Sequence, residues 1–254
     1  IGKGDEVITV SNSWISTSET ISQTGAKPVF VDIEKDFYNI KVDEISNKIN
    51  SNTKAIIPVH IYGQPADMKP IIDICEDYKL NLIEDCAQSH FAIYKNREVG
   101  TFGDAGTFSF FPGKNLGAYG DAGAIITNDD TLASCARKFS NHGSLVKHKH
   151  EIEGINSRLD GLQASILETK LDYILEWNNK RRYNAKIYNN LLSDVSEIIL
   201  PKTRSDCTHV FHVYCIRAKR RDELKLFLEN KGISCQIHYP KPLPFLEAYR
   251  SYNY

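Results

Sequence analysis

Short apolar runs alternate with amphipathic segments through the first 130 residues of the chain. Apolar and β-branched runs of about four to eight residues are typical of buried strands, whereas apolar residues at helical spacing indicate amphipathic helices. The predicted helices are residues 42–50, 67–79 and 131–139. The predicted strands are residues 6–10, 28–33, 55–60, 81–86, 105–111 and 123–127. Because strands that alternate with helices form a mostly parallel sheet covered on both faces, the pattern predicts an α/β domain.

The pattern changes in the second half of the chain. Residues 158–192 carry an apolar stripe at helical spacing, which predicts a long helix packed on the core. Beyond Pro201, residues 209–218 and 233–239 are typical of strands, and residues 221–232 between them are typical of a helix that ends on a glycine. This part of the chain is therefore predicted to form a smaller α+β unit.

These patterns divide the chain into two expected domains. We predict a large cofactor-binding domain over residues 1–175 and a small C-terminal domain over residues 176–254. The chain opens almost directly with a strand and ends without a closing element. We therefore interpret it as a fragment that lacks the N-terminal part of the large domain and the end of the small one.

Composition and charge narrow the range of partners. The chain has 254 residues, 31 Lys and Arg against 32 Asp and Glu, and a net charge of −1, which argues against nucleic acid or an acidic membrane as the main partner. Its longest apolar runs have roughly six residues, whereas a membrane-spanning helix needs about 20. Six scattered cysteines, no Cys-x-x-Cys pair and no signal-peptide pattern indicate reduced thiols in a cytoplasmic protein.

The segment LIEDCAQSH, residues 82–90, is the first that carries candidate chemistry. Asp85 and Gln88 follow an apolar run that is typical of a buried strand, and ligands of open α/β sheets bind at the carboxyl ends of the strands. A carboxylate in this place is costly unless it meets a cation. The alternative for Asp85 is a helix N-cap.

The segment GTFSFFPGKNLGAYGDAGAIIT, residues 106–127, is the second. It places Lys114 in a glycine-rich loop between two predicted strands, and glycines let a backbone approach a ligand closely. A lysine there indicates a phosphate contact or a Schiff base, and the alternative is a solvated turn lysine. The Walker phosphate loop is absent, and no GxGxxG follows the first strand, which argues against a nicotinamide dehydrogenase.

Together the two segments resemble a known family. Asp-x-x-Gln, SFFPGKN and GDAGAI resemble the pyridoxal-phosphate-dependent nucleotide-sugar aminotransferases of the DegT/DnrJ/EryC1/StrS family. The resemblance runs over essentially the whole chain, through GDEVITVSNSWISTSETI, PVFVDI, PVHIYGQPADM, RKFSNHG, GINSRLDGLQASIL, HVFHVYCIR and IHYPKP. It implies fold type I, the aspartate-aminotransferase-like fold, with a large α/β domain, a small C-terminal domain and active sites shared by a homodimer.

The resemblance also implies roles for single residues. Lys114 would form the Schiff base with pyridoxal 5′-phosphate, so its amine must be neutral part of the time, at a pKa below the usual ~10. Asp85 would hold the proton on the ring nitrogen, which makes the ring an electron sink. Gln88 would reach the O3′ side of the ring.

Further cofactor contacts are implied at three positions. Ser109 matches a residue that hydrogen-bonds the cofactor phosphate, and Trp14 matches the aromatic residue that stacks on the ring. For Trp14 the alternative is a core tryptophan at the end of a strand. Asn156 matches an asparagine that reaches the phosphate in the partner subunit's site, and Arg158 beside it either helps there or forms an interface salt bridge.

The implied reaction is the transfer of an amino group, from L-glutamate, to a nucleotide-linked keto-sugar in deoxyamino sugar and polysaccharide biosynthesis. The wording KNLGAYGDAGA after the lysine resembles the branch that acts on 3-keto hexoses, so we predict amination at C3. Alternatives are amination at C4 of a 4-keto sugar and a non-catalytic regulatory protein of the same fold. The dehydratase branch has histidine in place of the lysine, so Lys114 argues against it.

A group of four residues, Cys207, His209, His212 and Cys215, raises the question of a metal. In a strand, alternation places His212 on the face opposite the other three, which does not suit tetrahedral zinc. The family has these histidines without metal. We therefore predict no metal site. His60, at the end of a predicted strand, is either a buried structural histidine or a functional one.

Overall fold

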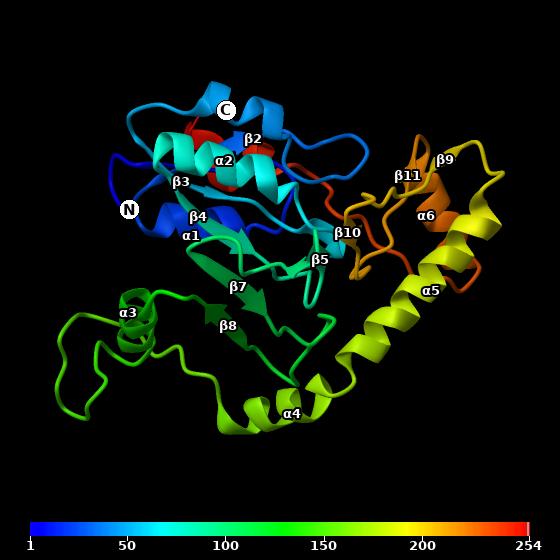
Figure 1. Ribbon diagram of the computed structural model, residues 1–254. Helices are drawn as coiled ribbons and strands as arrows, with labels where there is room; N and C mark the ends of the chain where they lie inside the picture. The colour runs from blue at the N-terminus through cyan, green and yellow to red at the C-terminus, as the bar shows by residue number, and fades with distance from the viewer. Residues whose placement is uncertain (253) are drawn as a thin grey trace.

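The computed structural model describes residues 1–252 and residue 254, and a six-stranded sheet forms its centre (Figure 1). The strand order is β2-β1-β3-β4-β7-β8, in which β8 alone runs antiparallel to its neighbour. This mostly parallel sheet confirms the predicted α/β class. The strands are β1 (Glu6–Val10), β2 (Lys27–Val31), β3 (Thr53–Ile57), β4 (Asn81–Asp85), β7 (Ala105–Ser109) and β8 (Gly123–Ile126).

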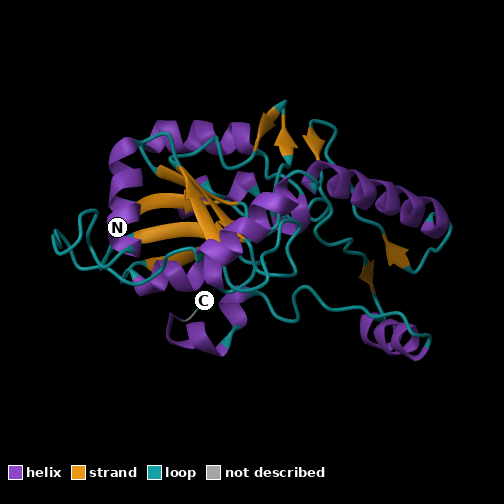
Figure 2. Cartoon of the chain, turned by 90° about the horizontal axis from the view of Figure 1, so that it is seen from below, coloured by secondary structure: helices purple, strands orange, loops and turns teal. Residues whose placement is uncertain are grey.

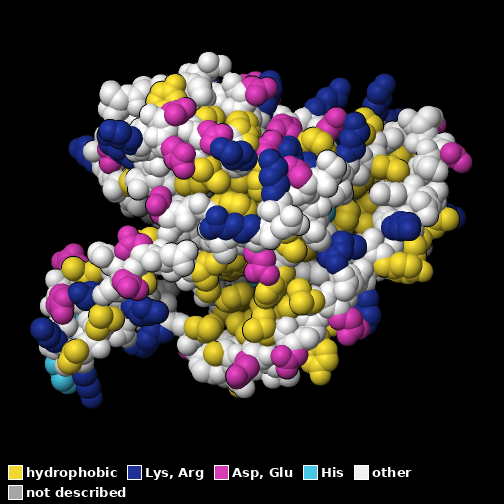
Figure 3. All heavy atoms as spheres, in the orientation of Figure 1, with side chains coloured by type: hydrophobic (Ala, Val, Ile, Leu, Met, Phe, Trp, Pro, Cys, Tyr) yellow, Lys and Arg dark blue, Asp and Glu magenta, His cyan; other side chains and the backbone are white. Residues whose placement is uncertain are grey.

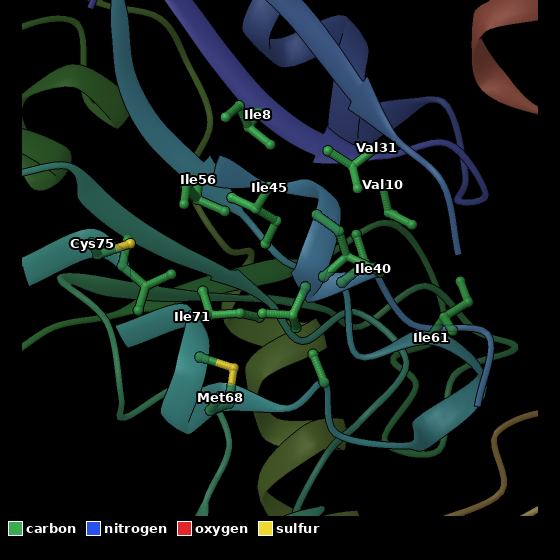
Figure 4. Packing of buried hydrophobic residues seen from close by; sticks show 14 of the residues in the cluster. Ile8, Val10, Val31, Ile40, Ile45, Ile56, Ile61, Met68, Ile71 and Cys75 are labelled. Carbon is green, nitrogen blue, oxygen red and sulfur yellow. The ribbon is translucent and has the colours of Figure 1, made fainter. Parts of the chain in front are cut away.

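One face of the sheet carries the main core. Because side chains alternate between the two faces of a strand, Ile8 of β1 and Ile56 of β3 point to the same side. There they pack with Met68 and Ile71 of helix α2 (Met68–Tyr78), in a cluster of side chains with almost no exposed surface (Figure 4). Each side chain buried in this way contributes about 1.5–3 kcal/mol to stability.

The opposite face is covered by helix α1 (Ser16–Gln23). Val7 and Ala55, which alternate with the residues of the main core, pack there against Ile21 of α1. Figure 2 shows the sheet between its helices from a second direction. The covering of both faces agrees with the pattern of the sequence.

The chain continues from β8 into further helices. Helix α3 (Asp130–Ser140) begins after Asp129, whose carboxylate caps it by accepting hydrogen bonds from the backbone N–H groups of residues 131 and 132. Helices α4 (Gly161–Leu171) and α5 (Ile174–Leu192) replace the single long helix that was predicted. The apolar stripe continues across the break, which is why the periodicity alone did not reveal it.

The second half of the chain departs most from the predictions. Residues 209–218 do not form one strand. Instead, β10 (Cys207–Thr208) joins the small sheet of β5 (Ile93–Tyr94) and β6 (Arg97–Glu98), whereas β11 (Arg217–Ala218) pairs with β9 (Ile198–Ile199) next to α6 (Arg221–Asn230). The strand predicted at 233–239 is wrong, because within the described chain this segment joins no sheet and hydrogen-bonds to the large sheet's loops instead.

Three smaller points complete the fold. Residues 42–50 form two single turns of 3-10 helix, Val42–Glu44 and Ser46–Lys48, in place of the predicted helix. Helix α5 continues across the domain boundary predicted between residues 175 and 176, and that boundary stays a prediction. Over the described residues, no helix combines the length and the apolar content that a membrane crossing would require.

Candidate active site

Asp85 ends β4 at the carboxyl edge of the sheet, and its carboxylate is held in a fixed orientation. Its Oδ2 accepts a hydrogen bond from Thr17 Oγ1 at 2.7 Å, and its Oδ1 accepts one from the backbone N–H of Ala87 at 3.0 Å. The backbone N–H of Asp85 donates to the carbonyl of Pro58, and its carbonyl accepts from the backbone N–H of His60, so the residue is also tied to the chain after β3. No helix follows Asp85 directly in the described chain, so the N-cap alternative is wrong, although Oδ1 does cap a turn.

Sequence reasoning missed Thr17, which comes from the first turn of α1. Its hydroxyl contacts Ser13 Oγ at 2.8 Å as well as Asp85, and both hydroxyl residues are buried. The only signal in the sequence is the run of Ser and Thr through residues 11–24. Such a run is equally typical of a helix start, so it did not distinguish a site residue.

Lys114 lies in the loop between β7 and β8 with its side chain half-buried. Burial lowers the pKa of its amine, while the negative charge of Asp85 opposes part of that decrease, and the net pKa lies below the usual value. The lysine is therefore neutral more often than a solvated one, and it lies near enough to Asp85 for the charge of that carboxylate to act on it. The alternative of a solvated turn lysine does not fit this position.

Gln88 is buried and fully oriented by its neighbours. Its Oε1 accepts a hydrogen bond from the backbone N–H of Tyr62 at 2.6 Å, and its Nε2 donates to Tyr239 Oη at 2.9 Å. Among the described residues this Nε2 has one hydrogen-bond acceptor, Tyr239, so its second N–H can donate to a ligand. Tyr239 belongs to the segment that was predicted to be a strand, so its arrival at the site was not foreseen.

Ser109 and Trp14 border the same region. Ser109 is the last residue of β7, and with Thr17 and Asp85 it lines a cavity of about 430 Å³, a size typical of small-molecule sites. Trp14 is 60% exposed, and its ring centre lies 6.1 Å from that of Tyr239. A core tryptophan would be buried, so that alternative is wrong.

Asn156 and Arg158 lie in the excursion between α3 and α4. Both residues are exposed. Asn156 forms an isolated antiparallel β-bridge with Asn141, and Arg158 Nη1 donates to the side-chain Oδ1 of the same Asn141 at 2.9 Å. Arg158 and Ser109 line one further cavity of about 1050 Å³. In the part of the chain that the structure describes, no hydrogen bond joins Asn156 to the other site residues, and its role stays a prediction.

His60 is a structural histidine. Its Nε2 lies 3.1 Å from Glu84 Oε2, and its Nδ1 accepts a hydrogen bond from the backbone N–H of Ala66 at 3.0 Å. The Glu84 carboxylate also accepts three backbone N–H bonds, from residues 100, 102 and 103. Cys86 lies close enough to complete a set of metal ligands, but both nitrogens of His60 are already used.

The groups present suit pyridoxal phosphate. An oriented carboxylate can hold a protonated ring nitrogen, an amine of lowered pKa can attack a carbonyl carbon, and the free N–H of Gln88 can donate to a phenolic oxygen. When bound, this cofactor supplies an electron sink for amino-group transfer. Asp85, Gln88, Ser109 and Lys114 would hold it, with Trp14 beside the ring.

The carboxyl edge of the sheet thus carries an oriented carboxylate near a half-buried lysine, an arrangement that suits an α/β enzyme that binds its cofactor through a lysine. The chain belongs to the DegT/DnrJ/EryC1/StrS aminotransferase family, whose model matches residues 1–254. This membership confirms the resemblance seen in the sequence and the prediction of an aminotransferase.

Three curated relatives are similar over most of the chain. A "pleiotropic regulatory protein" of Geobacillus stearothermophilus and the dTDP-3-amino-3,6-dideoxy-α-D-galactopyranose transaminase of Aneurinibacillus thermoaerophilus are each 46% identical over 100% of this chain and 69% of their own length. The UDP-N-acetyl-3-dehydro-α-D-glucosamine 3-aminotransferase of Acidithiobacillus ferrooxidans is 43% identical over 95% of this chain and 65% of its own. The chain thus spans about two thirds of these relatives.

Two solved structures are similar in fold. DesV of S. venezuelae, in complex with a ketimine intermediate, matches with a TM-score of 0.96 and 40% identity over 99% of this chain and 68% of its own. The Bacillus subtilis protein ntda, with bound cofactor PMP, matches with a TM-score of 0.88 and 35% identity over 97% and 57%. Aminotransferases of this family depend on pyridoxal phosphate, so the predicted cofactor is confirmed at the level of the family.

Proposed function

We propose that the protein holds pyridoxal phosphate on Lys114 and transfers an amino group from L-glutamate to C3 of a nucleotide-linked 3-keto hexose. The observation that carries the proposal is the pair of a half-buried Lys114, near enough to Asp85 to be influenced by its charge, and an Asp85 carboxylate that Thr17 and Ala87 hold in one orientation. In this proposal Lys114 binds the cofactor and moves protons. Asp85 holds the ring-nitrogen proton, Gln88 and Ser109 bind the O3′ and the phosphate, and Trp14 stacks on the ring.

Two separate observations support C3 as the carbon that is aminated. The loop after Lys114 carries Ala118, which is fully buried, and Tyr119, which is exposed, and in this proposal the loop shapes the approach to the lysine. Amino transfer needs the sugar carbon at attack distance, roughly 3–3.5 Å, and the wall that this loop forms selects which carbon reaches it. The names of two relatives place the amino transfer at C3, one on a sugar linked to dTDP and the other on a sugar linked to UDP.

We further propose a cytoplasmic homodimer with shared sites. Large apolar side chains are exposed around the site, and Figure 3 shows hydrophobic atoms gathered where Figure 1 draws β7, β8 and α4. Such a contiguous patch is typical of a surface that another protein covers. The exposed residues include Phe111, Tyr119, Ile125, Leu159 and Leu162. Asn156 of each chain would then reach the site of its partner.

The covalent link is tested first. The protein purified with pyridoxal phosphate should show a visible absorption band, and borohydride should attach the cofactor to the peptide that contains Lys114. The Lys114→Ala variant should lose the band and the activity, because its amine is absent, while it keeps the thermal midpoint of the wild type. Lys35→Ala, an exposed lysine elsewhere, is the matched control. Retention of transamination by Lys114→Ala would refute the proposed role.

The substrate is tested with a small panel. The protein should convert 3-keto hexoses linked to dTDP or UDP in the presence of L-glutamate, and NMR of the product should place the nitrogen on C3. Nitrogen on C4 would refute the C3 assignment and leave the aminotransferase unaffected.

The name of the Geobacillus relative favours a second candidate, a regulatory protein without turnover. A wild-type protein without a visible band and without product would support that candidate.

A further inference from the structure

Asn115 follows Lys114 directly, and its side chain is buried in a network of hydrogen bonds. Its Nδ2 donates to Asn178 Oδ1 of α5 at 2.8 Å and to the backbone carbonyl of Val210 at 3.1 Å. Its Oδ1 lies 3.2 Å from Nδ1 of His212. None of these residues was assigned a function by the sequence pattern.

The chemistry of the partners fixes the orientation of both amides. A backbone carbonyl only accepts, so the carbonyl of Val210 must face the Nδ2 of Asn115 and not its Oδ1. The same argument applies to Asn178, whose Nδ2 donates to the backbone carbonyl of His90 at 3.0 Å, which leaves its Oδ1 to accept from Asn115. The two amides are therefore aligned head to tail, with each polar atom opposite a complementary group.

This alignment decides the tautomer of His212. Because Asn115 presents its Oδ1, which only accepts, His212 must carry its proton on Nδ1 and leave Nε2 unprotonated. Burial lowers the pKa of His212 to about 3, with the charges of Lys114 and Arg181 acting in the same direction, so the ring is neutral near pH 7. The imidazole then anchors the loop without adding a positive charge beside the lysine.

The network joins four segments at the residue next to the lysine. These are the loop after β7, helix α5, the chain between β10 and β11, and the loop after β4 that also carries Gln88. We propose that Asn115 is a positioning residue that holds the backbone beside Lys114 against α5 and the 209–213 segment. We call its hydrogen bonds to Asn178, Val210 and His212 the clamp. His212, in its Nδ1–H form, donates the last of these bonds. This inference rests on the proposed role of Lys114.

Two substitutions of His212 distinguish its hydrogen bond to Asn115 from any other role of this side chain. In His212→Asn the side-chain amide lies near the former Nδ1 and can still donate to Asn115, whereas in His212→Gln the amide lies near the former Nε2 and that bond is lost. Asn115→Ala removes the clamp itself. Asn184→Ala, an exposed asparagine of α5, is the matched control. The two histidine variants keep the proposal testable if Asn115→Ala does not fold.

The readout is the pKa of the Lys114 amine in the cofactor-free full-length protein, measured by competitive acetylation and mass spectrometry at a series of pH values. Release of the clamp hydrates the lysine, so we expect Asn115→Ala and His212→Gln to raise this pKa by about one unit, with His212→Asn and Asn184→Ala close to the wild type. The reverse order of the two histidine variants, or an equal response of both, would overturn the proposal. The measurement needs no cofactor, so a wild-type protein that fails to bind pyridoxal phosphate would remove the proposed function alone.

Discussion

Lys114 and Asp85 owe their chemistry to unequal surroundings. The lysine is half-buried and loses hydration, which lowers its pKa, whereas Asp85 keeps two hydrogen-bond donors on its carboxylate. A carboxylate held in one orientation at this position can hold a proton on a ring nitrogen. The division of roles between the two residues therefore follows from where β4 and the β7–β8 loop place them.

The Asp85→Asn substitution tests this division. We expect kcat/KM to fall by about 100-fold or more, because a neutral amide cannot stabilise the protonated ring nitrogen. The amide oxygen can still accept from the backbone N–H of Ala87 while the amide nitrogen donates to the hydroxyl oxygen of Thr17, so the thermal midpoint should change little. Steady-state kinetics with and without added cofactor provide the measurement, and Asp77→Asn, an exposed aspartate of α2, is the control. Wild-type kinetics in Asp85→Asn would contradict the assignment.

A local pattern in the sequence marks candidate site residues, whereas the residues that contact them through tertiary hydrogen bonds carry no such mark. Asp85 and Lys114 could be proposed because Asp85 ends one strand and Lys114 lies in the loop after another, and both strands have a clear apolar pattern. Thr17 lies 68 residues from Asp85, and Asn115 lies 97 residues from His212. No local periodicity encodes pairs so far apart, so the network around the lysine required the structure.

At the scale of elements, the strands of the central sheet were predictable because burial on both faces leaves an almost continuous apolar run. The errors occur where a segment is short or is stabilised by another part of the chain. Residues 233–239 have a strand-like composition, but Tyr239 and the carbonyl of His238 bond to Gln88 and Tyr62 instead of to a strand. The break between α4 and α5 has no proline or glycine to mark it.

The buried Glu84 of β4 is expected to matter for stability. It accepts bonds from His60 and from three backbone N–H groups, which tie two loops to the strand. Glu84→Gln places an amide N–H against these donors and should lower the free energy of unfolding by about 3 kcal/mol. Urea unfolding measures the loss, with Glu76→Gln, an exposed residue of α2, as the control. Equal stability of the two variants would show that the tie is unimportant.

At the scale of the whole molecule, buried histidines make stability depend on pH. Burial lowers the pKa of His90 to about 4 and that of His209 and His212 to about 3. The unfolded chain takes up these protons near pH 6.5, so stability is full above that value and decreases as the pH falls from about 6.5 toward about 4. Each histidine contributes a slope of up to about 1.4 kcal/mol per pH unit.

The measurement is the free energy of unfolding in urea at several pH values across this window. The ring centre of His90 lies 5.6 Å from that of Phe108 and 5.7 Å from that of Phe110, so His90→Phe should preserve the aromatic packing and make the pH dependence shallower. His148→Gln, an exposed histidine, should leave the slope unchanged. A slope that is the same in all three proteins would show that His90 does not titrate on unfolding.

If the protein is a homodimer with shared sites, two inactive variants should restore activity when they are combined in one dimer. If Asn156 serves the partner's site, a mixed dimer of Asn156→Ala and Lys114→Ala chains has one site with both lesions and one with neither. Random mixing then restores about a quarter of the wild-type sites, although each variant alone is inactive.

If Asn156 instead serves its own chain, each site of the mixed dimer carries one lesion, and mixing restores nothing. Arg158 and Ser109 line the same cavity within one chain, so this second outcome is a real alternative that the mixing experiment decides. Activity is measured after the two variants have been unfolded and refolded together, with the Asn156→Ala, Lys114→Ala double variant mixed with itself as the control. An active monomer in sedimentation would refute both the dimer and the shared site. Restored activity, in contrast, would place Asn156 across the interface, next to the exposed apolar surface around β8 and α4 that a second copy would bury.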